Sequence, residues 1–207
     1  KTILLANSKL VGWFIKVLNP TLHFQAGNFN DLPLLEQAFD KANVDIANKL
    51  ISLHKESWEQ LEVSRTFTGN TLVNLAQASL ESSYTKWREL EKQKIELVQE
   101  LEAQNNEFFI KAYQLENELS PEVELKDVTL NGNPDYRYRD RINKKLTSED
   151  RNKLFQTDTI AELLSYIVGC TMGRYSLDRE GIVYAHAGND GFDDLVTEGA
   201  YATYLPD

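Results

Sequence analysis

Apolar or small residues recur at steps of three and four over much of the chain, which is the spacing of one face of a helix. A first run covers residues 35–61 and consists of Leu35, Phe39, Ala42, Ile46, Leu50, Leu53, Ser57 and Leu61. A second run covers residues 72–119 and consists of Leu72, Ala76, Leu80, Ser83, Trp87, Leu90, Leu97, Leu101, Phe108, Ala112, Leu115 and Leu119. Gly69 and Asn70 separate the two runs, and Pro121 ends the second. We therefore predict two long helices.

The second helix would extend roughly 70 Å at 1.5 Å per residue, too far to bury its apolar stripe alone. We predict an antiparallel hairpin that turns at residues 66–70, with residues 35–61 lying along the first half of the longer helix. A third helix over residues 159–172, capped by Asp158 or Thr159, would pack against the second half. Its predicted apolar face consists of Ile160, Leu163, Leu164, Ile167 and Val168.

These elements predict a mainly α fold: a long antiparallel helical hairpin, an additional packed helix and a few short strand-like segments. One strand-like segment follows the third helix, at residues 181–185. Along the sequence we divide the chain into residues 1–34, a hairpin over 35–120, a connector over 121–150, and a helix with a terminal segment over 151–207. Charged residues dominate the predicted outer faces of the long helices. They indicate solvent-exposed surfaces with ion pairs between side chains four residues apart.

Composition limits the function classes. The net charge of −10 argues against a chain that wraps DNA, because neutralisation of phosphates by basic residues supplies most of that affinity. The single cysteine, Cys170, excludes an internal disulfide and suits a reducing cytoplasm. Since no stretch of eighteen apolar residues occurs, we expect no membrane contact.

The stretch SYIVGCTMGRYSLDREGIVYAHAGN, residues 165–189, combines the end of the third helix with a polar turn and a short apolar segment. It resembles the C-terminal half of PglX-type adenine-specific DNA methyltransferases and related fused restriction-modification enzymes. In that family a helix ending in G-C-x-x-G-R-Y-S-L-D is followed by G-[LI]-x-[YF]-A. The matching residues are Gly169, Cys170, Gly173, Arg174, Tyr175, Ser176, Leu177, Asp178, Gly181, Ile182, Tyr184 and Ala185. Thr171 stands where the family pattern has methionine.

Residues 6–33 carry a second resemblance to the same enzymes, at the end of their target-recognition domain. There an L-N-S-K helix start precedes N-P-T-x-x-F-Q-x-G and a leucine-proline exit. The matching residues are Asn7, Ser8, Lys9, Asn19, Pro20, Thr21, Phe24, Gln25, Gly27, Leu32 and Pro33. Because the chain starts at Lys1 and both patterns are in register, we interpret it as a piece of a longer polypeptide.

The resemblance implies a parent enzyme that transfers a methyl group from S-adenosylmethionine to adenine N6 in DNA, in BREX phage defence or a restriction-modification system. The catalytic motifs would lie upstream. This chain would then be a non-catalytic recognition and scaffold segment without a cofactor of its own. Its expected partners are DNA, through the parent enzyme, and other defence subunits. The alternative is a coiled-coil module that binds a protein and never touches DNA.

The tetrapeptide Asn133-Pro134-Asp135-Tyr136 resembles the N-P-P-Y signature of amino-methyltransferases, whose aromatic residue stacks on a flipped base. Its third residue is aspartate, and no glycine-rich cofactor loop follows a strand upstream. We therefore interpret it as a turn and assign the chain no catalytic residue.

The residues after this turn form a basic cluster with interleaved aromatics. Its members are Tyr136, Arg137, Tyr138, Arg139, Arg141, Lys144 and Lys145. Arginine suits phosphate and tyrosine can stack, so these are candidate DNA-backbone contacts. The competing interpretation is a solvated loop whose arginines pair with nearby carboxylates.

Other chemistry-bearing residues receive structural interpretations. The three histidines are scattered without metal-ligand spacing, so we assign no metal site. Cys170 lies on an apolar helix without a nearby base and is interpreted as a packing residue. Gly169 and Gly173 would permit close packing, while Arg174 and Asp178 could pair across the turn after the helix.

Overall fold

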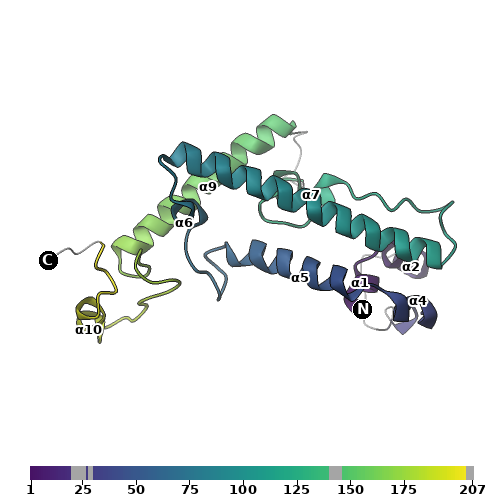
Figure 1. The fold of residues 1–207 in the computed structure, drawn as a ribbon, viewed down its shortest axis with the longest axis horizontal. Coiled ribbons are helices and arrows are strands. Elements are labelled where there is room, and N and C mark those ends of the chain that lie inside the picture. Colours follow the sequence, from purple (N-terminus) through teal and green to yellow (C-terminus); the bar gives the residue numbers. More distant parts are fainter. Residues whose placement is uncertain (20–26, 28–29, 140–145, 204–207) are drawn as a thin grey trace. The chain divides into compact units, whose positions relative to one another are not determined.

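A computed structural model describes residues 1–19, 27, 30–139 and 146–203, and its regular structure is helical (Figure 1). The elements are α1 (Thr2–Ala6), α2 (Lys9–Leu18), α4 (Glu36–Lys41), α5 (Val44–Glu59), α6 (Thr71–Leu75), α7 (Leu80–Ala112), the 3-10 helix η1 (Leu125–Asp127), α8 (Pro134–Arg137), α9 (Ser148–Thr171) and α10 (Phe192–Thr197). The predicted mainly α fold is confirmed. No strand occurs within the described ranges, and the segment predicted as strand-like, residues 181–185, is irregular there.

The chain forms two compact units, each built from two separate stretches. The first contains Lys1–His54 and Gln93–Val128, and the second contains Lys55–Lys92 and Thr129–Asp207. Helices α5 and α7 contribute residues to both units. The four segments predicted from the sequence are each continuous in the chain, whereas each compact unit combines two stretches that are distant in the sequence.

In the first unit, α5 and the later turns of α7 run antiparallel. His54 Nε2 lies 3.8 Å from Glu102 Oε1, whereas the Leu35 amide donates to Tyr113 Oη at 2.9 Å, at the opposite end of the pairing. Helices α1 and α2 pack with α5 and α7 in one hydrophobic core. Its buried residues are Leu4, Leu5, Leu10, Val11, Ala42, Ala47 and Phe109. The predicted antiparallel hairpin is present. Its predicted register is wrong, because α5 lies along the later turns of α7 rather than along its first half.

The first predicted helix is also broken in two. Helix α4 ends at Lys41, and α5 begins at Val44. Between them, Asn43 Oδ1 accepts a hydrogen bond from the Asp45 amide at 3.0 Å. A short polar side chain that bonds to the backbone two residues later competes with a continuous helix. The apolar spacing alone could not show this local competition.

The buried face of α7 includes polar residues that the apolar pattern passes over. Asn105 Nδ2 donates to the Leu4 carbonyl at 2.9 Å, and Asn106 Oδ1 accepts from the Lys9 amide at 2.9 Å. Both amides are buried, whereas Leu97, which we placed on the inner face, is 42% exposed. The inner face is therefore rotated relative to the predicted one.

In the second unit, α9 packs against the first turns of α7. The rings of Trp87 and Phe155 stack with centroids 5.3 Å apart and an interplanar angle of 15°. These residues share a core with Leu72, Tyr138 and Leu163. The prediction that the third helix packs against the second half of the long helix is therefore wrong.

Helix α9 also begins well before the predicted residue 159. Thr147 caps it: the Thr147 hydroxyl accepts from the Asp150 amide at 3.1 Å, and Asp150 Oδ2 accepts from the Thr147 amide at 3.0 Å. The sequence T-S-E-D encodes this reciprocal capping box, with an acidic residue three positions after the threonine, and the helix therefore starts earlier than the apolar spacing predicts. Of the predicted apolar face, Leu163 is buried, but Leu164, Ile167 and Val168 are 57%, 46% and 56% exposed.

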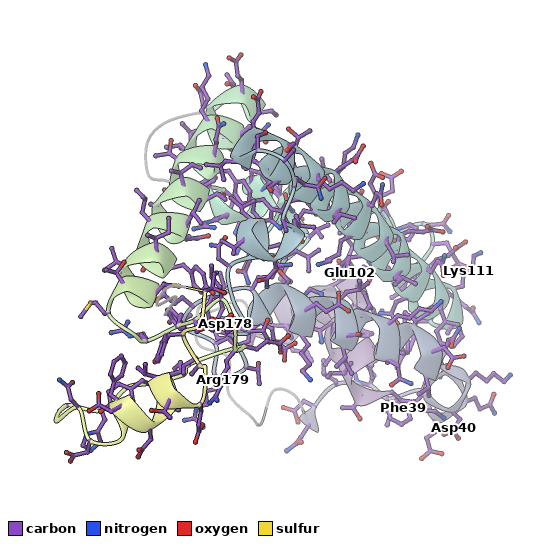
Figure 2. All side chains as sticks on the ribbon, turned by 60° about the vertical axis from the view of Figure 1, so that its left-hand side comes forward. Phe39, Asp40, Glu102, Lys111, Asp178 and Arg179 are labelled. Carbon is purple, nitrogen blue, oxygen red and sulfur yellow. The ribbon has the colours of Figure 1, made fainter. Side chains whose placement is uncertain are left out.

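The outer faces of the helices carry charged side chains of both signs (Figure 2). Lys111 pairs with Glu107 at 2.5 Å, and Lys153 pairs with Glu149 at 2.7 Å, each four residues apart. These exposed pairs contribute little stability individually. Among the described helices, none combines the length and apolar composition that a bilayer crossing requires.

Candidate functional site

The near-match to N-P-P-Y forms the start of helix α8. Asn133 is the N-cap and its side chain accepts from the Asp135 amide at 3.1 Å, while Pro134 occupies the first turn. Asn133 is 1% exposed. Its side-chain carbonyl is thus occupied by helix capping, a role for which asparagine is favoured.

The first residues of the basic cluster are tied to α9. Arg137 Nη2 donates to Glu162 Oε1 at 2.7 Å and lies 3.7 Å from Asp158 Oδ2. Tyr138 is 3% exposed, and its hydroxyl donates to Asp158 at 2.7 Å. Burial disfavours the charged guanidinium, but the hydrogen bond and charge of Glu162 outweigh it and raise the pKa of Arg137. Arg137 therefore has the carboxylate partners that the competing interpretation predicted.

The rest of the cluster is more open. Arg139 is exposed, and its guanidinium carbon lies 4.9 Å from the ring centroid of Tyr136. The other three candidates, Arg141, Lys144 and Lys145, lie outside the described residues. Among the described members of the cluster, Arg139 is the exposed arginine.

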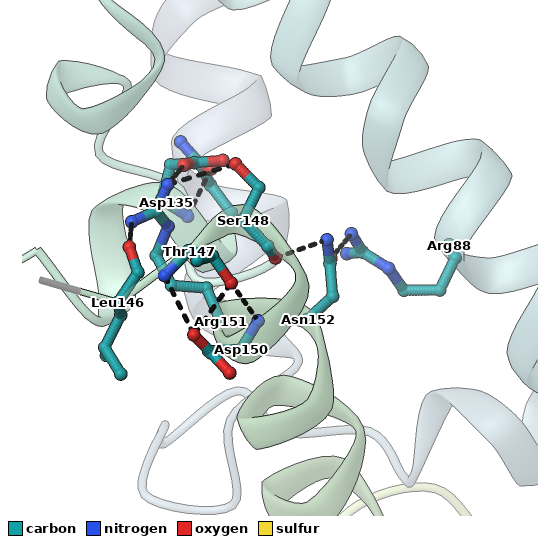
Figure 3. A network of polar contacts seen from close by, with 9 residues as sticks. Arg88, Asp135, Leu146, Thr147, Ser148, Asp150, Arg151 and Asn152 are labelled. Carbon is teal, nitrogen blue, oxygen red and sulfur yellow. Dashed lines mark hydrogen bonds and ion pairs between the residues drawn. The ribbon is translucent and has the colours of Figure 1, made fainter.

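A polar network joins α7, α8 and the start of α9 (Figure 3). Arg151 donates to the Leu146 carbonyl and pairs with Asp135, both at 2.7 Å. On the opposite side, Arg88 Nη2 donates to Asn152 Oδ1 at 3.3 Å. Because Arg151 of α9 pairs with Asp135 of α8, the network holds α8 beside α9.

The signature residues build the end of α9. Gly173 has a φ of +74°, and its amide donates to the Cys170 carbonyl at 2.9 Å. The Arg174 amide donates to the Gly169 carbonyl at 2.8 Å. This pair of bonds around a left-handed glycine is the Schellman motif, which satisfies the last helical carbonyls. The chain then folds back, so that the ring of Tyr175 lies on the helix at Gly169.

This fold-back leaves no room for a side chain at Gly169. A Cβ atom there would lie 2.4 Å from Tyr175 Cδ2. The Tyr175 ring is 2% exposed, stacks on Tyr166 with centroids 5.2 Å apart, and meets Phe67 edge-on at 5.5 Å. The spacing of glycine and tyrosine in the signature thus encodes close packing between helix and turn.

The polar residues of the signature bond to other parts of the second unit. The Tyr175 hydroxyl donates to Glu62 at 2.9 Å, and burial together with this bond raises the pKa of Tyr175 to about 12. Asp178 accepts from the Thr203 amide and hydroxyl, which lower the pKa of its carboxyl. Arg174 lies 3.9 Å from Glu62. The expected pairing of Arg174 with Asp178 is thus replaced by these separate partners.

A cavity of about 190 Å³ lies beside these packed residues within the second unit. One face of α9 lines it through Phe155, Thr159, Glu162 and Tyr166, and Trp87 of α7 and Arg137 of α8 border it as well. The apolar spacing of the sequence predicts Trp87 only as a residue of a helix face, and it predicts no role for Glu62 or Glu162. Trp87 and Glu162 reach the cavity through the pairing of α7 with α9, and Glu62 reaches it through its bonds to Ser165 and Tyr175; none of these contacts has a local sequence signal.

Other candidates for chemistry remain separate. Cys170 is a buried free thiol. The described residues contain no group of three histidine, cysteine, aspartate or glutamate side chains able to hold a metal ion. Ser8 caps α2 by accepting from the Val11 amide at 3.4 Å, which accounts for one part of the N-terminal resemblance. Pro20, Thr21, Phe24 and Gln25 lie outside the described residues.

The chain is thus a helical segment whose signature residues are engaged in packing and capping. No family model matches it. It is 36% identical over 201 residues to the adenine-specific methyltransferase BrxX of Escherichia coli O9:H4 (strain HS), and 30% identical over 205 residues to the adenine-specific methyltransferase PglX of Lacticaseibacillus casei (strain Zhang). Each match covers 97% of this chain but only 16% and 15% of the respective relative. The resemblance to PglX-type enzymes is confirmed: over nearly its whole length the chain is similar to one segment of each of these two adenine-specific methyltransferases.

Proposed function

We propose that this chain is a non-catalytic scaffold segment of an S-adenosylmethionine-dependent adenine-N6 DNA methyltransferase of the PglX type, acting in phage defence or restriction-modification. The supporting observation is the extent of the match: 97% of this chain against 16% of a relative named as an adenine-specific methyltransferase. The catalytic motifs of such an enzyme would lie in the remainder of its length.

The geometry agrees with a non-catalytic role. Asn133 begins the tetrapeptide that resembles the N-P-P-Y signature, and it is buried and caps α8. The signature around Gly169 and Tyr175 is likewise engaged in packing. Since both motifs serve the fold, the chain would position other parts of the enzyme rather than transfer a methyl group.

We expect the isolated chain to bind no S-adenosylmethionine, because it contains no glycine-rich loop after a strand to hold that cofactor. Isothermal titration of the folded chain with the cofactor measures this, with the full-length parent enzyme as the positive control. A cooperative unfolding transition must be shown first, since an unfolded chain would also give no heat. Micromolar binding by the chain alone would overturn the non-catalytic assignment.

We further propose that the enzyme uses this segment for a local contact with the DNA backbone through Arg139. In the full-length parent, Arg139→Gln should weaken binding to target and non-target duplexes equally, because phosphates carry no sequence information. Losing one phosphate contact should reduce the log–log salt slope by about one unit. Titrations at several salt concentrations measure that slope.

Arg137→Gln is the matched control. Its guanidinium is held by Glu162, so this change should leave the salt slope unaltered. An unchanged slope for Arg139→Gln would contradict the DNA contact. If that variant also lost a co-purifying defence subunit while its DNA affinity stayed intact, the protein-interaction alternative would replace the DNA contact.

A further inference from the structure

The last turns of α9 are apolar on two sides. Residues 163–172, LLSYIVGCTM, contain no charged side chain. One side is buried in the second unit and includes Leu163, Tyr166 and Cys170. The other side is open: Leu164, Ile167, Val168 and the C-cap Met172 are 57%, 46%, 56% and 71% exposed. Because a helix that is apolar all round is normally buried, this second side lacks a covering layer among the described residues.

The open side residues form one continuous face. Together with the half-buried Ile160, they follow one another at steps of four, three, one and four residues, which is the spacing of one helix face. We call this set, residues 160, 164, 167, 168 and 172, the α9 stripe. It extends over roughly 18 Å at 1.5 Å per residue, about three turns of helix.

The carboxylates of α9 closest in sequence to the stripe are directed elsewhere. Glu162 accepts from Arg137 at 2.7 Å, and Asp158 accepts from the Tyr138 hydroxyl at 2.7 Å, so both contact α8 and its C-cap. The stripe therefore presents no charge to a partner. A partner that placed a charged group on it would bury that charge unpaired, at a large cost. The surface that fits the stripe is apolar.

The stripe continues into a groove where α9 ends. The groove has a volume of about 550 Å³, and Met172, Tyr184 and Phe192 line it, with Arg174 and Asn189 on its polar side. The rings of Tyr184 and Phe192 meet edge-on with centroids 5.3 Å apart. Methionine adapts its shape to different partners, and aromatic rings offer large contact areas. A partner along the stripe would thus find further contact surface beyond the end of the helix.

The size of the stripe favours a partner from the same polypeptide over a second copy of the chain. An apolar patch of this kind exposes on the order of a few hundred Å². Each partner in a stable complex of separate proteins buries about 800 Å². A tethered partner needs less area, because the connection supplies an effective concentration of about millimolar. The two relatives offer such a partner, since this chain covers only 16% and 15% of their lengths.

We propose that the α9 stripe is the docking face for an amphipathic helix from the remaining length of the parent enzyme, whose apolar side lies along α9. A helix fits because the stripe follows helical spacing over about three turns, and helices pack through such ridges. The proposal rests on the proposed function in one respect, namely that the chain is a segment of a longer methyltransferase.

Thiol labelling measures whether the stripe is covered. Val168→Cys should react with a maleimide reagent as an exposed thiol in the isolated chain, because Val168 is 56% exposed. In the full-length parent, the same position should react at least about tenfold more slowly, since the docked helix must open before the reagent enters. Tandem mass spectrometry distinguishes this position from Cys170, which is buried.

Lys153→Cys is the matched control on the same helix. Lys153 pairs with Glu149 near the start of α9, and its side chain is 70% exposed. Because it precedes the stripe, this position should react equally fast in the isolated chain and in the parent. Protection of both positions in the parent would overturn a docking face confined to the stripe. Unchanged labelling at position 168 would overturn docking altogether.

Leu164→Glu tests whether the contact runs along the stripe. In the isolated chain, this change should leave the urea midpoint unaltered, because Leu164 is 57% exposed. In the parent, it should restore labelling of Val168→Cys, since a carboxylate buried against an apolar helix has no partner. Continued protection of position 168 in that variant would overturn the proposal.

The labelling rate in the isolated chain excludes other occupants. Slow labelling of Val168→Cys there would overturn the proposal: a rate that rises on dilution would identify a second copy, and a constant rate would identify another part of the chain. Methyl transfer to DNA by the same parent preparations separates the two proposals. An active parent in which position 168 stays labelled rejects only the docking face. A protected position in a parent that transfers no methyl group rejects only the proposed function.

Discussion

Leu101→Ala should lower the free energy of unfolding by roughly 2–5 kcal/mol, the range for removing a buried leucine side chain. Leu101 is 6% exposed on α7 in the first unit, where Val98 and Phe109 are also buried. The substitution removes contacts and leaves a space that the surrounding helices can only partly fill. Urea or guanidinium unfolding of the chain measures the change.

Leu97→Ala is the matched control on the same helix. Leu97 is 42% exposed, so the same chemical change should cost less than about 1 kcal/mol. The apolar pattern placed both leucines on the inner face, whereas the structure separates them. Equal losses for the two variants would contradict the rotated inner face described for α7.

Gly169→Ala should destabilise the chain by about 1–3 kcal/mol, although alanine is the better helix former by roughly 1 kcal/mol. The new methyl group would lie 2.4 Å from the Tyr175 ring, which Tyr166 and Phe67 hold from other sides. The ring must move or the turn after α9 must open. Thermal and chemical unfolding both report the loss.

Gly12→Ala provides a control of opposite sign. Gly12 lies within α2, and among the described residues nothing beyond its chain neighbours and its own helix backbone lies within 4 Å of the place where its Cβ would stand, so alanine should stabilise the chain by about 0.5–1 kcal/mol. In a Tyr175→Ala background, Gly169→Ala should lose its penalty, because the clashing ring is gone. A penalty that persisted there would show that Tyr175 is not its cause.

Local chemistry made several features readable from the sequence. Ser8, Asn70, Asn133 and Thr147 each cap a helix through a side-chain oxygen, a role that these residue types favour. Gly173 marks the end of α9 because glycine adopts a positive φ without steric cost. The capping box at Thr147 is a local signal too, and it starts α9 earlier than the apolar spacing predicts.

The candidate site was less accessible to sequence reasoning. The basic and aromatic cluster identified the neighbourhood of Arg137, but the carboxylate of Glu162 that holds it lies on another helix. Trp87 appears in the sequence as one apolar residue among many. Its unpartnered donor and its place beside the cavity emerge only when α7 and α9 pack together.

The sequence by itself determined the helical character of the chain and its resemblance to PglX-type enzymes, because apolar spacing and motif residues are local properties. Tertiary structure decided which helix faces are buried and which parts of α5, α7 and α9 lie side by side. Asn105 and Asn106 are buried on α7 because backbone groups of α1, α2 and residue 121 bond to their amides. A polar side chain becomes an inner-face residue only when distant backbone groups satisfy it, and hydrophobic periodicity does not encode those partners.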